Sequence, residues 1–158
     1  MWLELSNFWV AILNVTGIPA AHFGLSWAFT RMPAGWFRPD SMMFRAWPGE
    51  STGFHERVFR VKAWKHLLPD AAGWFGGFAK RSLRGRDPEY LAVFRIETCR
   101  GEAAHWAQWI VISAFVAWTP WPWALVLPVY AALSNLPCIV LQRHNRLRLQ
   151  KVLGGNNF

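Results

Sequence analysis

The densest group of ionisable side chains in the sequence lies between residues 97 and 105. It contains Glu97, Arg100, Glu102 and His105, and on a helix Glu102 and His105, three residues apart, would share one face. Ionisable groups at membrane depth are costly and are functional or paired by default. The segment therefore predicts proton-transfer chemistry. The structural alternative is an ion pair between Glu97 and Arg100, with Glu102 reaching toward water.

A second candidate for proton transfer is the segment Trp64-Lys65-His66-Leu67-Leu68-Pro69-Asp70. A histidine can take the proton of an attacking hydroxyl, and an acid can hold its ring in the required tautomer. We expect His66 or His105 to be the general base, oriented by Asp70 or by a glutamate of the first cluster. The alternative here is a solvated histidine beside an aspartate that ends a helix. The expected catalytic residues are His66, Asp70, Glu97, Glu102 and His105.

The tail 142–158 is basic and has no acidic residue. A guanidinium group binds phosphate or carboxylate through a two-pronged fork, which indicates a site for the anionic groups of a donor or for a developing oxyanion. The alternative is a positively charged anchor at the membrane surface. The expected substrate-binding residues are Lys65, Arg100, Arg143, Asn145, Arg146 and Arg148.

The Glu102-x-x-His105 pair is also one half of the motif used by carboxylate di-metal bundles. The sequence has one copy of it, so a divalent metal would need ligands from other segments. If a metal is bound, the expected ligands are Glu97, Glu102, His105 and His66. Cys99 and Cys138 lie in different segments without metal or redox spacing, and we interpret them as ordinary thiols.

The composition indicates that membrane-embedded helices position these clusters. Of 158 residues, 53% are hydrophobic, 16% are charged and 12 are Trp. Soluble domains carry about 25% charged residues, and Trp favours the boundary between bilayer and water. The net charge of +8 alone would also suit nucleic acid. Because it accompanies long apolar runs, we expect an anionic membrane surface or a phosphorylated substrate as the partner, and no nucleic acid.

Two uncharged runs predict three membrane spans. Residues 8–29 contain no Lys, Arg, Asp or Glu, and about 20 such residues suffice to cross the hydrocarbon core. Residues 103–141 are equally uncharged, but as one helix they would be roughly 58 Å long. The segment Thr119-Pro120-Trp121-Pro122 should break this run into a hairpin. The predicted spans are about 8–29, 97–118 and 123–141.

The basic residues predict the orientation. All Lys and Arg residues except Arg100 lie in the loop 31–96 and the tail 142–158, whereas the N-terminal segment and the hairpin turn carry none. The positive-inside rule then places the N-terminus outside and the C-terminus inside a bacterial-type inner membrane. Apolar residues at helical spacing from Phe54 to Leu68 predict an amphipathic helix on the membrane surface. We thus expect one all-α integral membrane domain, 1–158, with three transmembrane helices, interfacial helices in the long cytoplasmic loop, and the clusters gathered in one site.

The chain resembles the glycosyl-4,4'-diaponeurosporenoate acyltransferases of staphyloxanthin-type carotenoid biosynthesis from Arg31 to Leu149. The residues that carry the resemblance are Arg31-x-Pro33-x3-Phe37, Trp64-Lys65-His66-x3-Asp70, Glu97-Thr98-x-Arg100-x-Glu102-x2-His105-Trp106, Asn135-x-Pro137 and Gln142-Arg143-x-Asn145-Arg146-x-Arg148-Leu149. The resemblance implies transfer of a fatty acyl group to a sugar hydroxyl of a glycosylated, lipid-like acceptor. Its implied site residues are His66, Asp70, Glu97, Arg100, Glu102, His105, Asn145 and Arg146.

Two other functions stay open on the sequence. One is a metal-dependent membrane hydrolase or transferase that uses the Glu and His cluster. The other is a non-catalytic membrane adaptor whose basic loop binds anionic lipid. For the acyltransferase, the expected partners are a lipid-like acceptor and an acyl donor such as acyl-CoA, a divalent metal is the cofactor to test for, and the sequence leaves the oligomeric state open.

Overall fold

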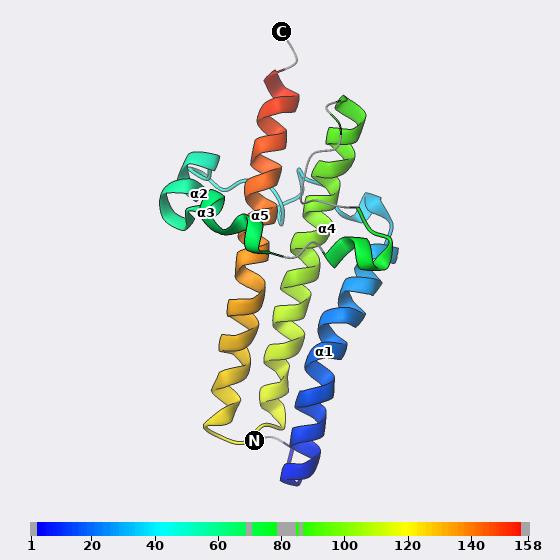
Figure 1. Cartoon of the computed structure of the whole chain (residues 1–158), viewed down its shortest axis with the longest axis vertical. Coiled ribbons are helices and arrows are strands. Elements are labelled where there is room, and N and C mark those ends of the chain that lie inside the picture. Colours follow the sequence, from blue (N-terminus) through cyan, green and yellow to red (C-terminus); the bar gives the residue numbers. More distant parts are fainter. Residues whose placement is uncertain (1–2, 69–70, 79–84, 86, 156–158) are drawn as a thin grey trace.

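The computed structural model describes residues 3–68, 71–78, 85 and 87–155, and this part of the chain is helical with no β-strand. Three long helices form a bundle: α1 (Asn7–Arg31), α4 (Pro88–Ser113) and α5 (Val126–Gly155). Figure 1 shows α4 between α1 and α5, running antiparallel to both. The all-α prediction is therefore confirmed for the described residues.

Helix α1 closely matches the first predicted span. It contains Pro19 and ends at Arg31. The next residue, Met32, is extended because the following Pro33 disfavours a helical residue before it. Val10 is the one buried residue in the helix. Large apolar side chains such as Phe8, Val15 and Trp27 are exposed on its outer surface.

Within the described residues, two segments are long and apolar enough to cross a membrane, namely α1 and the helical segment Trp123–Gly154. Helix α4 is as long, but its last 18 residues include Glu97, Arg100 and Glu102. Two of the three predicted spans thus pass this test of length and composition.

Helix α4 begins nine residues before the predicted span. The side chain of Asp87 accepts a hydrogen bond of 2.8 Å from the backbone N–H of Tyr90, and Pro88 occupies the first helical position. Both are favourable at a helix start. The Asp-Pro pair, which also suits a turn, is here an N-cap followed by the first helical residue.

The predicted hairpin turn lies between α4 and α5. Two short 3-10 helices, η4 (Ala114–Ala117) and η5 (Trp123–Leu125), flank the prolines. The N-terminal segment lies at the same end of the bundle, since the Leu3 N–H donates to the Ala117 carbonyl over 3.0 Å. Hydrogen bonds from Asn14 to Thr119 (3.0 Å) and from Trp118 to Asn14 (3.0 Å) also join α1 to the turn.

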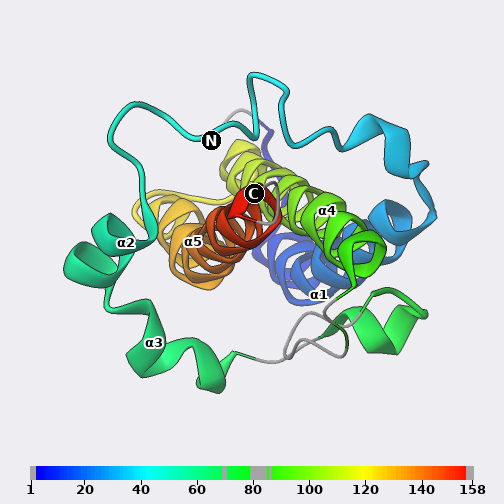
Figure 2. The same cartoon turned by 90° about the horizontal axis from the view of Figure 1, so that it is seen from above.

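The segment between α1 and α4 wraps around the bundle as a collar, which we define as residues 32–68 and 71–78. Figure 2 shows it encircling the three helices. Its helical elements are η1 (Ala34–Trp36), α2 (Thr52–Phe59), α3 (Val61–Trp64), η2 (Lys65–Leu67) and η3 (Ala71–Phe75).

The collar is less regular than the amphipathic helix predicted over Phe54 to Leu68. Arg60, with φ of 51°, adopts the left-handed conformation that ends α2. The indole N–H of Trp64 then donates to the Phe59 carbonyl over 2.7 Å, which satisfies a carbonyl that the helix end leaves open. The chain consequently bends around the bundle here.

Candidate functional site

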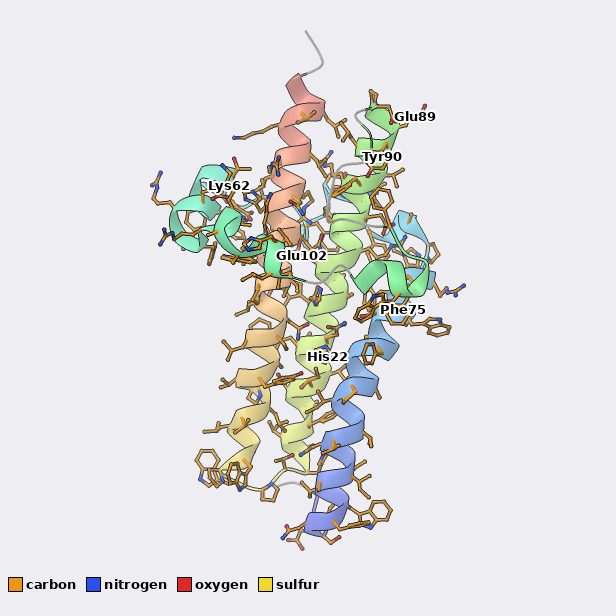
Figure 3. The ribbon with its side chains drawn as sticks, viewed as in Figure 1. His22, Lys62, Phe75, Glu89, Tyr90 and Glu102 are labelled. Carbon is orange, nitrogen blue, oxygen red and sulfur yellow. The ribbon has the colours of Figure 1, made fainter. Side chains whose placement is uncertain are left out.

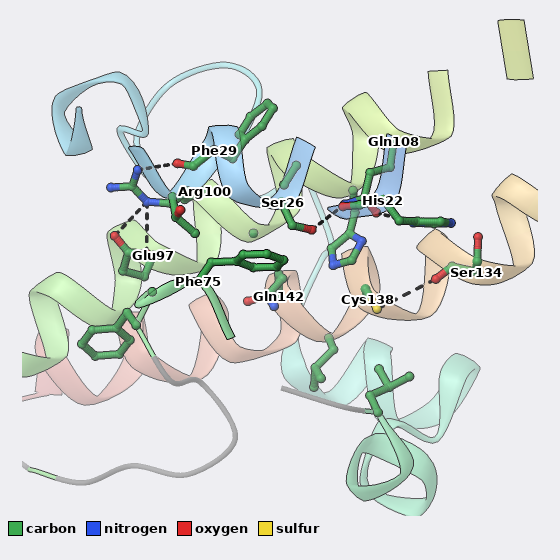
Figure 4. Close-up of a pocket in the computed structure, with 18 of the residues that line it drawn as sticks. His22, Ser26, Phe29, Phe75, Glu97, Arg100, Gln108, Ser134, Cys138 and Gln142 are labelled. Atoms are coloured by element: carbon green, nitrogen blue, oxygen red, sulfur yellow. Dashed lines mark hydrogen bonds and ion pairs between the residues drawn. The ribbon is translucent and has the colours of Figure 1, made fainter. Parts of the chain in front are cut away.

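A cavity of about 450 Å³ lies between α1, α4, α5 and the collar residues 68 and 75–78. Figure 4 shows its polar side chains converging from all three long helices. Helix α1 contributes His22 and Ser26, α4 contributes Glu97, Arg100, His105 and Gln108, and α5 contributes Ser134, Cys138 and Gln142. A cavity with apolar walls and a few convergent polar groups is typical of a ligand site.

His105 lies on the cavity wall, and a neighbour orients its ring. Its Nδ1 is 2.9 Å from the Oδ1 of Asn135, which is fully buried. The Asn135 amide nitrogen donates to the Ala131 carbonyl over 2.9 Å, so Oδ1 is the acceptor and Nδ1–H of His105 is the donor. In the neutral ring Nε2 then carries the lone pair, as a general base requires.

A second hydrogen-bonded group lies deeper between the helices. The Gln108 Oε1 is 3.0 Å from Nδ1 of His22, and its amide nitrogen donates to Ser26 Oγ over 3.0 Å. The Tyr130 hydroxyl is 3.3 Å from Nε2 of His22. The group ties α1 to α4 and α5, and its members His22, Ser26 and Gln108 add polar side chains to the cavity lining.

Glu97 and Arg100 form the ion pair that the sequence offered as the structural alternative. The Nε of Arg100 is 2.9 Å from Glu97 Oε1. The same guanidinium donates to the carbonyls of Phe29, over 2.7 Å, and Met32. It lies over the Phe37 ring at 4.8 Å. Arg100 therefore anchors the end of α1 and the start of the collar.

Glu102 faces away from the cavity, into a buried network at the level of the collar (Figure 3). It is 1% exposed. One of its oxygens accepts from Arg143 over 2.8 Å and the other from Arg146. Arg143 also binds Glu50 of the collar over 2.7 Å. The interpretation that Glu102 reaches toward water is wrong, because two guanidinium groups enclose it.

The same arginines hold the collar against α5. Arg143 lies over the Trp47 ring at 4.5 Å, and Arg146 donates to the Phe44 carbonyl over 3.0 Å. The guanidinium groups of both arginines are already hydrogen-bonded to groups of the protein. The geometry therefore favours a structural role for these two arginines over the binding of a donor's anionic groups.

The collar end of the network is sensitive to pH. Burial lowers the pKa of His55 below its usual 6.5, although the charge of Glu50 opposes this shift. Burial would raise the pKa of Glu50, but the hydrogen bonds and charge of Arg143 outweigh it and hold that pKa below 4.5. At neutral pH, Nε2–H of a neutral His55 thus donates to the Glu50 carboxylate over 3.0 Å.

We therefore expect the folded protein to lose stability as the pH falls below 6.5. The unfolded chain then takes up a proton that folded His55 resists, so the free energy of unfolding drops by at most about 1.4 kcal/mol per pH unit for one proton. Thermal unfolding between pH 7 and 5 measures this. His55→Gln keeps a donor for Glu50 and should reduce the slope, whereas an unchanged slope would contradict the assignment.

The remaining expected residues lie apart from the cavity or outside the described part. His66 and Arg148 are exposed, and Lys65 and Asn145 are half-buried. Asp70 lies outside the described residues. The single composite site predicted from the sequence is thus divided: Glu97, Arg100 and His105 line the cavity, whereas Glu102, Arg143 and Arg146 form the network beside it.

Among the described residues, no three His, Cys, Asp or Glu side chains come together in a way that could hold a metal ion. The four metal ligands expected from the sequence also lie in separate places. Glu97 and His105 line the cavity, Glu102 lies in the arginine network, and His66 is exposed.

Sequence reasoning missed Gln108, Ser134 and Glu50. Gln108 lies seven residues after Gly101, a spacing that puts both on one helical face, so the helical period could have identified it. Glu50 stands alone in an irregular segment and reaches Arg143 through the fold, and no local pattern signals that contact.

The comparisons with known proteins agree with the resemblance seen in the sequence. The family model described as glycosyl-4,4'-diaponeurosporenoate acyltransferase matches residues 33–154. A protein of that name from Staphylococcus haemolyticus is 30% identical over 148 residues, 92% of this chain and 80% of the relative. A second, from Staphylococcus aureus, is 30% identical over 126 residues, 78% of this chain and 76% of the relative. No solved structure matches the chain.

Proposed function

The chain belongs to the glycosyl-4,4'-diaponeurosporenoate acyltransferase family, and from this premise we propose that it transfers a fatty acyl group to a hydroxyl of a glycosylated, lipid-like acceptor. The observation that carries the proposal is His105 on the cavity wall, with its tautomer set by Asn135. Acyl transfer to a hydroxyl needs a general base within hydrogen-bond reach of that hydroxyl. It also needs an enclosed space that holds the two substrates together.

In the proposed reaction, Nε2 of His105 takes the proton of the acceptor hydroxyl as its oxygen attacks the acyl carbonyl. The tetrahedral intermediate then collapses, the bond between the acyl carbon and the donor's leaving group breaks, and the imidazolium returns its proton to that group. The donor is a thioester such as acyl-CoA or another activated acyl ester. Of the arginines expected to bind substrate, Arg100 is the one that lines the cavity. Besides anchoring α1 through its ion pair and carbonyl contacts, its charge would favour the developing negative oxygen.

We propose that the enzyme works within a membrane, with α1, α4 and α5 as three spans. The outer surfaces of α1 and α5 carry exposed apolar side chains, including Val15 and Leu133 at 72% each. Exposed Trp residues occur both at the hairpin turn and in the collar, as is typical of the two interfaces of a span. Those at the turn are Trp121 and Trp123, and those in the collar are Trp36, Trp47 and Trp74.

The orientation follows from where the charges lie in the bundle. The Lys and Arg residues all come after Thr30, and the hairpin turn, which lies at the same end as the N-terminus, has none. The positive-inside rule supports an N-terminus outside, with the collar and the C-terminus on the cytoplasmic side. The collar would then rest at the inner interface, where an amphiphile can keep its tail in lipid.

Reconstituted protein tests the proposal directly. Purified protein in lipid nanodiscs receives a glycosylated carotenoid or an alkyl glucoside together with acyl-CoA, and mass spectrometry follows the sugar ester. Ester formation above the protein-free rate supports the proposal. Its absence with thioester and lipid-ester donors alike would overturn it. Bound metal, measured by elemental analysis and lost in Glu97→Ala, would favour the metal-dependent alternative instead.

Asn135→Leu should lower kcat about tenfold to a hundredfold. Leucine is similar in size but cannot accept the Nδ1–H of His105, so the ring loses the tautomer and orientation that the base needs. Asn135→Asp keeps an acceptor and should retain most of the activity. Initial rates of ester formation compare the two variants, and equal losses in both would contradict this role.

A further inference from the structure

Gln142 lines the cavity and carries a buried hydrogen-bond acceptor that no residue of the described part uses. Its side chain extends from α5 into the cavity (Figure 4), and its Oε1 is buried without a hydrogen-bond partner in the described part of the chain. Leaving a buried carbonyl unsatisfied costs free energy. A rotation of the carboxamide toward the cavity would let a donor of the ligand satisfy this atom.

Gly101 of α4 makes room for this side chain. A Cβ on Gly101 would come within 3.1 Å of Gln142 Cδ and 3.2 Å of its Nε2, which is closer than nearly all real contacts of a Cβ. The side chain of Gln142 therefore packs directly against the glycine. Gly101 precedes His105 by four residues on α4, about one helical turn, so the two positions lie on the same face of the helix, and both line the cavity.

The two substrates of an acyl transfer differ in the hydrogen-bond donors that they can present to an amide oxygen. The reacting ester or thioester of the donor has oxygen acceptors and no N–H or O–H, whereas a sugar carries several hydroxyl donors. The side chains of His22, Ser26 and Gln108, which also line the cavity, can both donate to and accept from the hydroxyls of a sugar. Both features favour the acceptor in this part of the cavity.

We propose that Gln142, seated on Gly101, is a specificity-determining residue that binds a second hydroxyl of the acceptor's sugar while His105 takes the proton of the reacting one. The inference rests on the proposed acyl transfer and adds to it the part of the site that selects a neutral glycosyl headgroup. A site with a hydrogen-bonding group for a substrate hydroxyl discriminates against analogues that lack that hydroxyl.

The test compares two acceptors in the reconstituted full-length protein. An alkyl glucoside offers several hydroxyls, and the alkanol of the same chain length offers only the reacting one. In Gln142→Leu, kcat/KM for the glucoside should fall about tenfold, the equivalent of one hydrogen bond of about 1.4 kcal/mol, while kcat/KM for the alkanol stays unchanged. Gly101→Ala, which displaces the carboxamide, should cause the same loss of selectivity.

Gln150→Leu is the matched control, because it makes the same change at an exposed position of α5. It should leave both acceptors unaffected. The melting temperature of Gln142→Leu should equal or exceed that of the wild type, since the variant removes an unpartnered buried acceptor.

An equal fall for glucoside and alkanol, or a raised KM for the acyl donor alone, would overturn the assignment of Gln142. A wild-type protein that acylates neither acceptor would instead overturn the proposed function, so the two failures can be told apart. A wild type that acylates both equally well, with no change in Gln142→Leu, would remove the sugar-selecting role and leave the acyl transfer standing.

Discussion

Replacing His105 with alanine should lower kcat for acyl transfer by about a hundredfold to ten-thousandfold, the usual contribution of a positioned general base. The hydroxyl of an acceptor is a weak nucleophile at neutral pH, and in the proposed reaction it is deprotonated by the imidazole whose Nδ1–H is held by Asn135. Initial rates at saturating acceptor measure the loss. The KM for the acceptor should change little, because the base acts mainly on the transition state.

His66→Ala is the matched comparison, since the sequence proposed both histidines for the same role. His66 lies exposed in η2, and its replacement should change kcat by less than about threefold. Both variants should keep the wild-type elution profile in detergent and its helical circular dichroism spectrum. A large loss in His66→Ala with near-normal rates in His105→Ala would reverse the assignment of the base.

Most of the helical architecture could be predicted from the sequence, because it follows from local rules. Runs without charge define the apolar parts of α1 and α5, and the pair Pro120 and Pro122 marks the hairpin turn. The predicted ends were less accurate. Helix α5 continues to Gly155, so most of the basic tail is helical, because a helix need not stop where the apolar run does.

The site was predicted less well, for a reason of helix geometry. Successive residues of a helix turn by about 100°, so Glu102 and His105, three apart, point about 60° apart. In α4 that angle separates a side chain in the cavity from one in the arginine network. Which face meets α1 and which meets α5 depends on how the whole bundle packs, and no local spacing contains that information.

The ion pair between Glu97 and Arg100, in contrast, could be predicted from local spacing. Its spacing of three residues suffices to form an ion pair within one helix, and the structure has that pair. Glu50 and Arg143 are far apart in sequence and yet form the link between the collar and α5. Contacts of this kind emerge only after the chain has folded, which is why the sequence offered the arginines as substrate-binding groups.

Glu102→Ala should be the most destabilising of these substitutions. It removes the carboxylate that accepts from both Arg143 and Arg146 and leaves two buried guanidinium groups short of a partner. Breaking a buried ion pair from one side costs about 3–5 kcal/mol. For a chain of this length that corresponds to a fall of about 10 °C in the melting temperature, measured by thermal unfolding in detergent. Arg148→Ala, which replaces an exposed arginine of α5, should shift the melting temperature by less than about 2 °C.

Glu102→Gln then separates a structural role from a catalytic one. Glutamine keeps the shape and one acceptor oxygen but loses the charge, so we expect an intermediate loss of stability. At a temperature where the variant stays folded, its kcat should remain within about threefold of the wild-type value, because Glu102 is enclosed by arginines and does not line the cavity. A hundredfold loss of kcat at an unchanged melting temperature would show instead that Glu102 takes part in the chemistry, through a rearrangement that opens the network when substrate binds.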